Sequence, residues 1–297
     1  MTTADVLVEI NNLTYSYPAP AGLLRRPKLA PPAIDDVSFS IAEGEVVALV
    51  GESGSGKSTI GRLLLGMLRP SSGNVLFDGQ DVHALRGRDS RRHRHNYQMV
   101  FQDPYSSLNP RMAIGDAIAE ALKITGETSA EARDSIAREL LARVRLGEDM
   151  FSRRPAELSG GQRQRVGIAR ALAAGPRLLV ADEALASLDV SIQAQVAGVL
   201  EELNEQEQLS MLFITHDLAM ARRLATRIIV LNKGRIVESG PAAEIIEHPK
   251  DPYTRALIEA VPIANPRIAR ARQHARLAQR SSQAATAAHA HLERKSL

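Results

Sequence analysis

A glycine-rich stretch at residues 51–59 constrains this chain more than any other part of its sequence. It matches the phosphate-binding pattern G-x-x-x-x-G-K-[ST] at every required position. The apolar run at residues 46–50 predicts a buried strand before it, and apolar residues at helical spacing predict a helix after it, as far as Pro70. A strand, a glycine turn and a helix N-terminus together aim several backbone N–H groups at one anion. The sequence therefore predicts a nucleotide phosphate site in an α/β fold.

The side chains of this loop have separate expected roles. Lys57 can reach the β- and γ-phosphates, and the Ser58 hydroxyl can take a place on Mg²⁺. The alternative is a chance match in a surface turn, which the strand before the loop and the helix after it argue against. The residues expected to hold the nucleotide here are Gly51, Ser53, Gly54, Ser55, Gly56, Lys57, Ser58 and Thr59.

Two later apolar runs end in residues that suit phosphate chemistry. Residues 178–181 lead into Asp182 and Glu183, and residues 211–215 lead into His216. Because ligands of open parallel sheets bind at the carboxyl ends of the strands, these side chains should face the phosphate loop. Asp182 can hold Mg²⁺, directly or through water, and Glu183 can orient and deprotonate the attacking water. An exposed acidic turn and a structural histidine are the alternatives.

Residues 104–156 predict a helical insert between core strands. Apolar residues recur at helical spacing in two groups there: Ile114, Ile118 and Leu122, and then Ile136, Leu140, Leu141 and Val144. Thr128 and Glu131 form a capping-box pattern that predicts the start of the second helix. Directly after the insert, Ser159-Gly160-Gly161-Gln162 opens another predicted helix. That helix N-terminus is a second possible anion site, although flexible loops often have the same composition.

The remaining segments predict a smaller β layer and a helical end. Alternating apolar residues at 6–17, 37–41 and 73–77 predict antiparallel strands beside the α/β core, and residues 228–237 predict a hairpin. Residues 242–260 predict a helical region interrupted around two prolines.

Composition excludes several classes of function. The chain of 297 residues has no cysteine, which excludes disulfides, thiolate metal sites and iron–sulfur ligation. Aromatic residues are scarce, which argues against a stacking platform for single-stranded nucleic acid. His93 and His95 lie in an arginine-rich run, residues 81–96, that is more typical of a solvated loop than of a metal site. The start of the chain lacks signal-peptide features and no apolar run could cross a bilayer, so we expect a soluble, cytoplasmic protein.

The basic character of the chain belongs to its C-terminal end. Residues 265–297 hold seven basic side chains and one acidic side chain, a formal charge of +6, which leaves −3 for residues 1–264 out of the total of +3. Attachment to anionic lipid or to a partner is one interpretation of this tail. A mobile, partly helical extension is the other, and we favour it.

With these segments in order, the chain resembles the ATP-binding subunits of ABC transporters over about residues 5–262. The ordered set carries the resemblance, because any single motif could arise by chance. Besides the phosphate loop, the set consists of Gln102 after Met99-Val100-Phe101, Leu158-Ser159-Gly160-Gly161-Gln162, Asp182-Glu183, Ala186-Ser187-Leu188-Asp189 and Thr215-His216-Asp217.

The resemblance implies an α/β, P-loop (RecA-like) ABC ATPase core with an antiparallel β subdomain, over residues 1–103 and 157–240. It also implies an inserted helical subdomain at 104–156 and a C-terminal helical extension at 241–264. The basic tail at 265–297 lies outside these parts and should be flexible.

The resemblance also assigns roles within the site. Tyr17 would stack on adenine, and Gln102 would sense Mg²⁺ and the attacking water beside the catalytic Glu183. His216 would contact the γ-phosphate. Two subunits would face each other head to tail, so that the signature segment of one closes over the ATP of the other. The cofactors would be ATP and Mg²⁺, with Ser58, Gln102 and Asp182 at the metal. Binding of ATP across the dimer would use Ser159, Gly160, Gly161, Gln162 and Asp189.

Two stretches narrow the resemblance to one branch of the family. Residues 101–110 and 251–257 look like the oligopeptide, dipeptide and nickel importers. Asp251 stands where that branch usually has histidine, and residues 184–187, Ala-Leu-Ala-Ser, replace the usual Pro-Thr-Ser-Ala. The contacts of that loop across the dimer are therefore in question. The iron–sulfur cysteine cluster of some relatives is absent.

This branch implies an ATP-hydrolysing subunit that energises import of oligopeptides, dipeptides or a similar small solute. Its partners would be two separate transmembrane permease subunits, a second ABC ATPase subunit and a solute-binding protein, at the cytoplasmic face of the plasma membrane. A related chain is common in this branch and is the expected second ATPase, with a copy of this chain as the alternative. An exporter or a nickel or glutathione importer is the alternative.

Two interpretations outside transport are weaker. An ABC ATPase that acts on DNA or ribosomes would need zinc cysteines, coiled-coil insertions or a basic groove, so we expect no nucleic acid partner. A purely regulatory module would need a broken hydrolytic set, whereas Lys57, Gln102, Glu183 and His216 are all in place.

Overall fold

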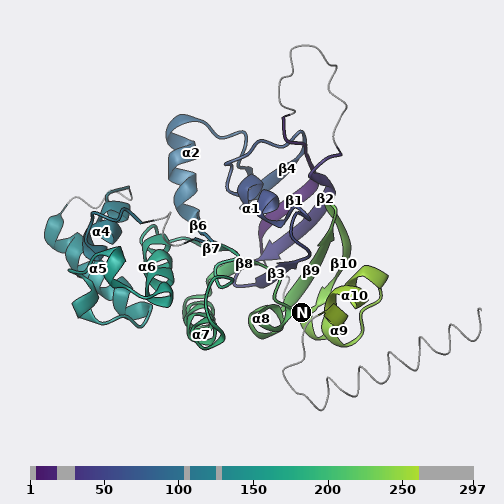
Figure 1. Ribbon diagram of the computed structural model, residues 1–297. Helices are drawn as coiled ribbons and strands as arrows, with labels where there is room; N and C mark the ends of the chain where they lie inside the picture. Colours follow the sequence, from purple (N-terminus) through teal and green to yellow (C-terminus); the bar gives the residue numbers. More distant parts are fainter. Residues whose placement is uncertain (1–4, 19–30, 104–107, 125–128, 261–297) are drawn as a thin grey trace, which may run out of the picture. The chain divides into compact units, whose positions relative to one another are not determined.

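The computed structural model describes residues 5–18, 31–103, 108–124 and 129–260 (Figure 1). The chain divides into two compact units, residues 1–255 and residues 256–297, and residues 256–260 are the described part of the second. The architecture that follows is that of the first unit. The predicted basic tail and the loop residues 104–107 and 125–128 lie outside the described residues.

A six-stranded, mostly parallel sheet forms the centre of the fold. In their order across the sheet, the strands are β10 (Arg235–Pro241), β9 (Arg227–Asn232), β3 (Val46–Val50), β8 (Ser210–Thr215), β7 (Leu178–Asp182) and β6 (Tyr97–Val100). Only β10 runs antiparallel to its neighbour, as the predicted hairpin requires. β3 is buried on both faces, which explains its uninterrupted apolar sequence.

The strand register brings the carboxyl ends of the central strands together. Val50, the last residue of β3, pairs with Thr215 at the end of β8, and Asp182 at the end of β7 pairs with Ile214. The phosphate loop, the acidic pair and the histidine therefore start from one edge of the sheet, as the sequence predicts.

A second, antiparallel sheet packs against the core. Its strand order is β2 (Ile34–Ala42), β1 (Val6–Tyr15), β4 (Ser72–Phe77) and β5 (Gln80–Asp81). The three longer strands confirm the predicted β layer, although β1 ends at Tyr15 rather than at residue 17. Alternate residues of these strands bury their apolar side chains against helix α1 (Lys57–Leu64) in one continuous core.

Helices cover both faces of the central sheet. α1 and the antiparallel sheet lie on one face, and α7 (Val190–Glu207) and α8 (Leu218–Leu224) lie on the other (Figure 1). The prediction that α1 continues as far as Pro70 is wrong. It ends at Leu64 because Gly66 adopts a left-handed backbone, with φ of 66°, and turns the chain.

The expectation of a solvated loop at residues 81–96 is also wrong in part. Residues 87–93 form helix α2 (Gly87–His93), followed by a short 3₁₀ turn at Arg94–Asn96. The His93 ring packs edge-on to Phe77 at a centroid distance of 5.4 Å, which fastens the end of this helix to the β layer.

The insert contains the two predicted helices, α4 (Ile114–Ile124) and α5 (Ala130–Arg143). The capping residue of α5 is Ser129, whose side chain accepts a hydrogen bond from the backbone N–H of Ala132, and not the predicted Thr128, which lies outside the described residues. Short 3₁₀ turns at Glu148–Met150 and Pro155–Glu157 lead to helix α6 (Gly160–Leu172).

After the β9–β10 hairpin come α9 (Ala242–Glu247) and α10 (Pro252–Ala260), which confirms the predicted interrupted helical region. None of the helices that the structure describes has both the length and the apolar character needed to span a membrane.

Candidate functional site

Two glycines of the phosphate loop have no room for a side chain. A Cβ on Gly51 would lie 2.2 Å from the carbonyl oxygen of Leu231 in β9. A Cβ on Gly56 would lie 2.7 Å from the carbonyl oxygen of Ala33, and the backbone of Gly56 has φ of 110°. The tight curl of the loop therefore requires glycine at both positions.

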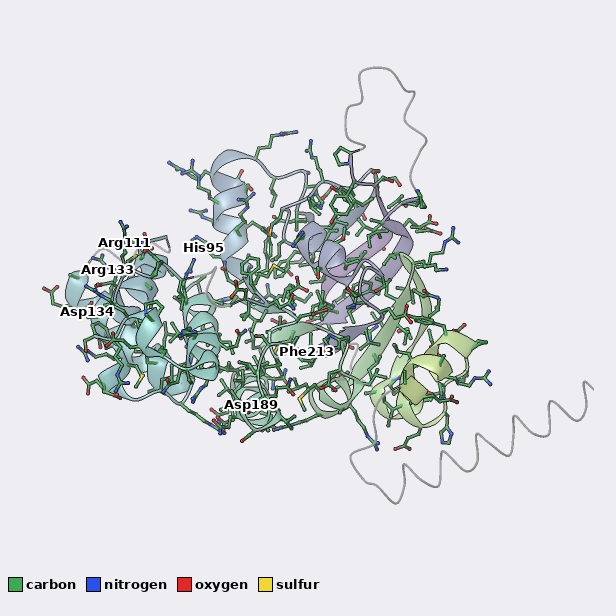
Figure 2. All side chains as sticks on the ribbon, viewed as in Figure 1. His95, Arg111, Arg133, Asp134, Asp189 and Phe213 are labelled. Atoms are coloured by element: carbon green, nitrogen blue, oxygen red, sulfur yellow. The ribbon has the colours of Figure 1, made fainter. Side chains whose placement is uncertain are left out.

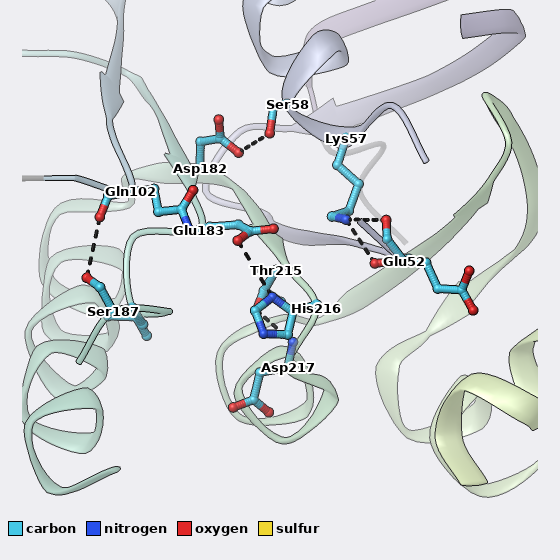
Figure 3. Close-up of polar contacts among 12 residues, drawn as sticks. Glu52, Lys57, Ser58, Gln102, Asp182, Glu183, Ser187, Thr215, His216 and Asp217 are labelled. Atoms are coloured by element: carbon cyan, nitrogen blue, oxygen red, sulfur yellow. Dashed lines mark hydrogen bonds and ion pairs between the residues drawn. The ribbon is translucent and has the colours of Figure 1, made fainter. Parts of the chain in front are cut away.

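The Lys57 side chain lies inside the turn of the phosphate loop. Its amine is nearly buried and donates hydrogen bonds to the carbonyl oxygens of Gly51 at 2.8 Å and Glu52 at 2.9 Å (Figure 3). Burial lowers the pKa of the Lys57 amine, and the carboxylates of Glu183 and Asp182 act in the opposite direction. The cation and the two acids therefore share one electrostatic environment.

Ser58 and Asp182 place two oxygen atoms together beside the loop. The Ser58 hydroxyl donates to Asp182 Oδ1 at 2.7 Å (Figure 3). Burial raises the pKa of Asp182, which is 7% exposed, although the Ser58 hydrogen bond works against that shift. A hydroxyl and a carboxylate in contact are the hard oxygen ligands that Mg²⁺ prefers, so the residues present fit that ion.

Glu183 and His216 meet across the ends of β7 and β8. Glu183 Oε2 lies 3.7 Å from His216 Nδ1, with Glu183 mostly buried and His216 largely exposed (Figure 3). The backbone of Glu183 is in the left-handed region, with φ of 48°, and its N–H donates to the carbonyl oxygen of Ile214 at 2.9 Å. A left-handed backbone at a non-glycine residue costs free energy and often occurs at functional sites.

Gln102 follows β6 at the same edge of the sheet. Val100 pairs with Ala181, so the segment after β6 runs beside the segment that carries Glu183. The Ser187 hydroxyl donates to the Gln102 carbonyl oxygen at 3.5 Å, a long hydrogen bond between the two segments (Figure 3).

Tyr17 lies at the rim of the phosphate loop. Its ring is half exposed, packs edge-on to Tyr15 at 5.0 Å, and its hydroxyl forms a 3.0 Å hydrogen bond with the Thr59 hydroxyl. A half-exposed ring fixed beside the loop is a suitable surface for a flat base.

The segment Ser159–Gln162 forms a second group, which packs against α7. Ser159 accepts a hydrogen bond from the N–H of Gln162, whose side chain accepts one from the N–H of Ser159, a complete capping box. A Cβ on Gly161 would lie 2.1 Å from Ile192 Cγ2, and Gly160 faces Leu188.

Asp189 belongs to this second group. It caps α7 by accepting a hydrogen bond from the N–H of Ile192 at 2.9 Å. The structure thus brings Ser159–Gln162 together with Asp189, whereas the contacts of residues 51–59 lead to Tyr17, β2, β7, the β9–β10 hairpin and Tyr253.

Two contacts of the phosphate loop have no counterpart in the sequence predictions. The Tyr253 hydroxyl accepts a hydrogen bond from the N–H of Glu52 at 3.0 Å, and the Ser55 carbonyl oxygen accepts one from the N–H of Gly234. Tyr253 lies within residues 251–257, which the sequence singled out only through a family resemblance, and Gly234 marks only a hairpin turn.

A phosphate loop after a central parallel strand, an acidic pair on the next strand but one and an inserted helical segment define a P-loop ATPase of the ABC cassette type. A family model described as "ABC transporter" matches residues 34–186, and one described as "Oligopeptide/dipeptide transporter, C-terminal region" matches residues 237–287. The chain belongs to the ABC transporter family and is an ATPase of that family.

Relatives and solved structures agree with this assignment. A probable peptide ABC transporter ATP-binding protein of Sinorhizobium fredii is 46% identical, over 90% of this chain and 76% of the relative. The oligopeptide transport ATP-binding protein OppF of Bacillus subtilis is 45% identical, over 88% of this chain and 84% of the relative.

Two solved structures share the fold. An ATP-binding cassette solved as a dimer with ADP and Pi has a TM-score of 0.70 and 31% identity, and covers 79% of this chain and 98% of that chain. The cbiO1 protein of Clostridium perfringens, part of the cbiONQ transporter complex, has a TM-score of 0.75 and 25% identity, and covers 91% of this chain and 99% of that chain. The predicted fold class is thereby confirmed.

Proposed function

We propose that this chain is the ATP-hydrolysing subunit that energises import of oligopeptides, dipeptides or a similar small solute through separate permease subunits. The observation that carries the ATPase part is the meeting of Lys57, Ser58, Asp182, Glu183 and His216 at the carboxyl ends of β3, β7 and β8. The cargo class rests on the match of residues 237–287 and on the names of the relatives.

The side chains divide the tasks of hydrolysis among them. Lys57 binds the β- and γ-phosphates, and Glu183 orients the attacking water and takes its proton. His216, 3.7 Å from Glu183, contacts the γ-phosphate and keeps the Glu183 carboxylate in place. Ser58, Asp182 and Gln102 would hold Mg²⁺, which would neutralise charge on the phosphate oxygens when bound.

The second group of residues acts in a partner subunit. Ser159, Gly160, Gly161, Gln162 and Asp189 lie together at the starts of α6 and α7, where helix N-termini and exposed side chains can meet an anion. Two ATPase subunits arranged head to tail would place this group over the γ-phosphate of the partner. Closing on ATP and reopening after hydrolysis is then the step that drives transport.

A cleft beside Gln102 is the proposed site for the permease. The cleft has a volume of about 730 Å³ and lies between the end of α1, β6 and α6. The residues that line it include Met67, His95, Met99, Phe101, Gln164 and Arg170. Figure 2 shows His95 at the end of α2, beside the insert. Phe101 and Met67 are exposed apolar side chains there, which a cytoplasmic helix of a membrane subunit could cover.

This docking would hold the chain at the cytoplasmic face of the plasma membrane as a peripheral subunit, with a solute-binding protein on the other side. One observation favours a second cargo. The glutathione import ATP-binding protein GsiA of Pectobacterium atrosepticum is 44% identical over 89% of this chain, which covers 42% of that relative. Glutathione is itself a small peptide, so the two cargo classes share their chemistry, and nickel remains a further alternative.

The test is uptake in cells that lack this chain. A labelled short peptide, glutathione and nickel are supplied in turn, and the chain is restored as wild type or as Glu183→Gln. The expected result is that wild type alone restores peptide uptake. Restoration by both forms would show that hydrolysis at this site does not energise the transport, and restoration of nickel uptake alone would assign the other cargo.

A further inference from the structure

We propose that Tyr253 is a positioning residue of the phosphate loop, so that the segment after β10 is a working part of the ATP site. The proposal rests on the ATPase assignment and adds to it a residue outside the ABC motifs. Tyr253 and Glu52 are 201 positions apart in the sequence, yet the Tyr253 hydroxyl accepts a hydrogen bond from the Glu52 backbone N–H at 3.0 Å.

Within the described part of the chain, the hydrogen bonds of Glu52 are made by its backbone. Its side chain is exposed, while its N–H donates to Tyr253 and its carbonyl oxygen accepts from the Lys57 amine at 2.9 Å and from the N–H of Ser55 at 3.2 Å. Lys57 also donates to the Gly51 carbonyl oxygen at 2.8 Å. A shift of Glu52 would therefore displace the lysine that binds the phosphates.

A chain of hydrogen bonds fixes the position of Tyr253. On β10, the Glu238 carboxylate accepts from the backbone N–H groups of Lys250 at 2.8 Å and Asp251 at 3.1 Å. The Asp251 carboxylate then accepts from the N–H groups of Tyr253 at 2.8 Å and Thr254 at 3.4 Å. Asp251, which departs from the usual histidine, thus caps α10 and sets the direction in which Tyr253 leaves its first turn.

The loop is held from its other side by the hairpin that precedes this segment. The N–H of Gly234, in the β9–β10 turn, donates to the Ser55 carbonyl oxygen at 2.9 Å, and Gly51 approaches the Leu231 carbonyl. β9, its turn and the segment after β10 therefore contact both ends of the loop. When the loop is already held in the conformation that binds phosphate, no binding free energy is spent on shifting it from conformations that cannot bind.

A purely structural role, in which the contact only fastens the first turn of α10, predicts a different outcome from a positioning role. If the hydrogen bond only stabilises the first turn of α10, its loss lowers thermal stability and leaves nucleotide affinity unchanged. Loss of a positioning contact raises the Kd and the KM for ATP with little change in kcat, because Tyr253 does not contact the water or the general base.

The experiment uses the full chain as Tyr253→Phe, which keeps the ring and removes the hydroxyl. The matched control is Arg255→Ala: Arg255 donates to the Lys250 carbonyl oxygen at 2.8 Å, so it fastens the same turn at a site other than the loop. For each form, Kd is measured with a fluorescent ATP analogue and Mg²⁺, KM and kcat by phosphate release, and the thermal midpoint without nucleotide.

The expected result is a rise in Kd and KM of about two- to tenfold for Tyr253→Phe, the equivalent of one hydrogen bond, with a thermal midpoint within about 4 °C of wild type. Arg255→Ala should keep the wild-type Kd. An unchanged Kd in Tyr253→Phe would overturn the proposal, and so would an equal weakening by Arg255→Ala, which would assign the effect to a loosened helix.

Lys57→Ala in the same assay separates this proposal from the ATPase assignment. A Lys57→Ala chain that loses the analogue while Tyr253→Phe binds it as wild type does would refute the role of Tyr253 alone. A Lys57→Ala chain with wild-type affinity would overturn the nucleotide site and the role of Tyr253 with it.

Discussion

Gly161→Ala should destabilise the junction between α6 and α7, and the structure gives the size of the effect. The new Cβ would lie 2.1 Å from Ile192 Cγ2, well inside contact distance. Ile192 is β-branched and stands on a helix, where its side chain has one strongly preferred rotamer, so the methyl group cannot simply rotate away. Overpacking that forces such a shift costs about 1–3 kcal/mol.

The same geometry predicts a rescue. Ile192→Ala removes the clashing methyl group and leaves Cβ of residue 192 about 3.5 Å from the new Cβ, which is ordinary contact. Ile192→Ala by itself removes a partly exposed side chain and should cost little. The double variant should therefore be more stable than the two single losses added together.

The assay is thermal unfolding of the four full-length forms, followed by circular dichroism because the chain has no tryptophan. ATP hydrolysis is measured in parallel, because Gly161 belongs to the proposed partner-facing group and a shifted α6 should slow turnover. Single losses that simply add in the double variant would refute the packing argument, and a Gly161→Ala chain as stable as wild type would show that no clash arises at all.

Four further predictions concern the ATP site. Lys57→Ala should abolish tight ATP binding, measured by equilibrium binding, and normal affinity would contradict the phosphate-loop assignment. Glu183→Gln should keep ATP binding and slow hydrolysis by about 10²–10⁴, the usual effect of a general base, whereas unchanged turnover would remove Glu183 from that role. Ser58→Ala should raise the Mg²⁺ concentration needed for half-maximal hydrolysis, and an unchanged requirement would exclude the Ser58 hydroxyl as a ligand. Hydrolysis per chain should rise with protein concentration, and Ser159→Arg should suppress that rise; a concentration-independent rate in dilute protein would argue against a site completed in trans.

The sequence predicts where the candidate residues of the site lie, because their positions follow from simple geometry. The phosphate loop is a contiguous motif, and Asp182, Glu183 and His216 each follow an apolar run that could only be a core strand. Parallel strands that lie side by side must end at one edge. Strand order was not needed to place these residues together.

The extents of two helices were harder to predict from the sequence. In α1 the missed signal is local, and in α2 the cause is a long-range contact. At the end of α1, apolar spacing continues through Met67 and Leu68, but Gly66 had already supplied the signal to stop. At α2, the sequence is short and highly charged, and the helix is fixed by the packing of His93 on Phe77, a contact that no local pattern contains.

The contacts that shape the phosphate loop could not be predicted from the sequence, because they too join residues that are far apart along the chain. On the loop, these contacts use only the Ser55 carbonyl and the Glu52 N–H, backbone groups that say nothing in the motif about their partners, Gly234 and the Tyr253 hydroxyl, about two hundred positions away. A motif records which side chains are required, whereas backbone hydrogen bonds leave no such trace. The residues proposed to perform hydrolysis come from the ends of β7 and β8, whereas the contacts of Gly234 and Tyr253 with the loop come from the segments after β9. Substitutions in the first set should therefore change turnover, and substitutions in the second should change affinity.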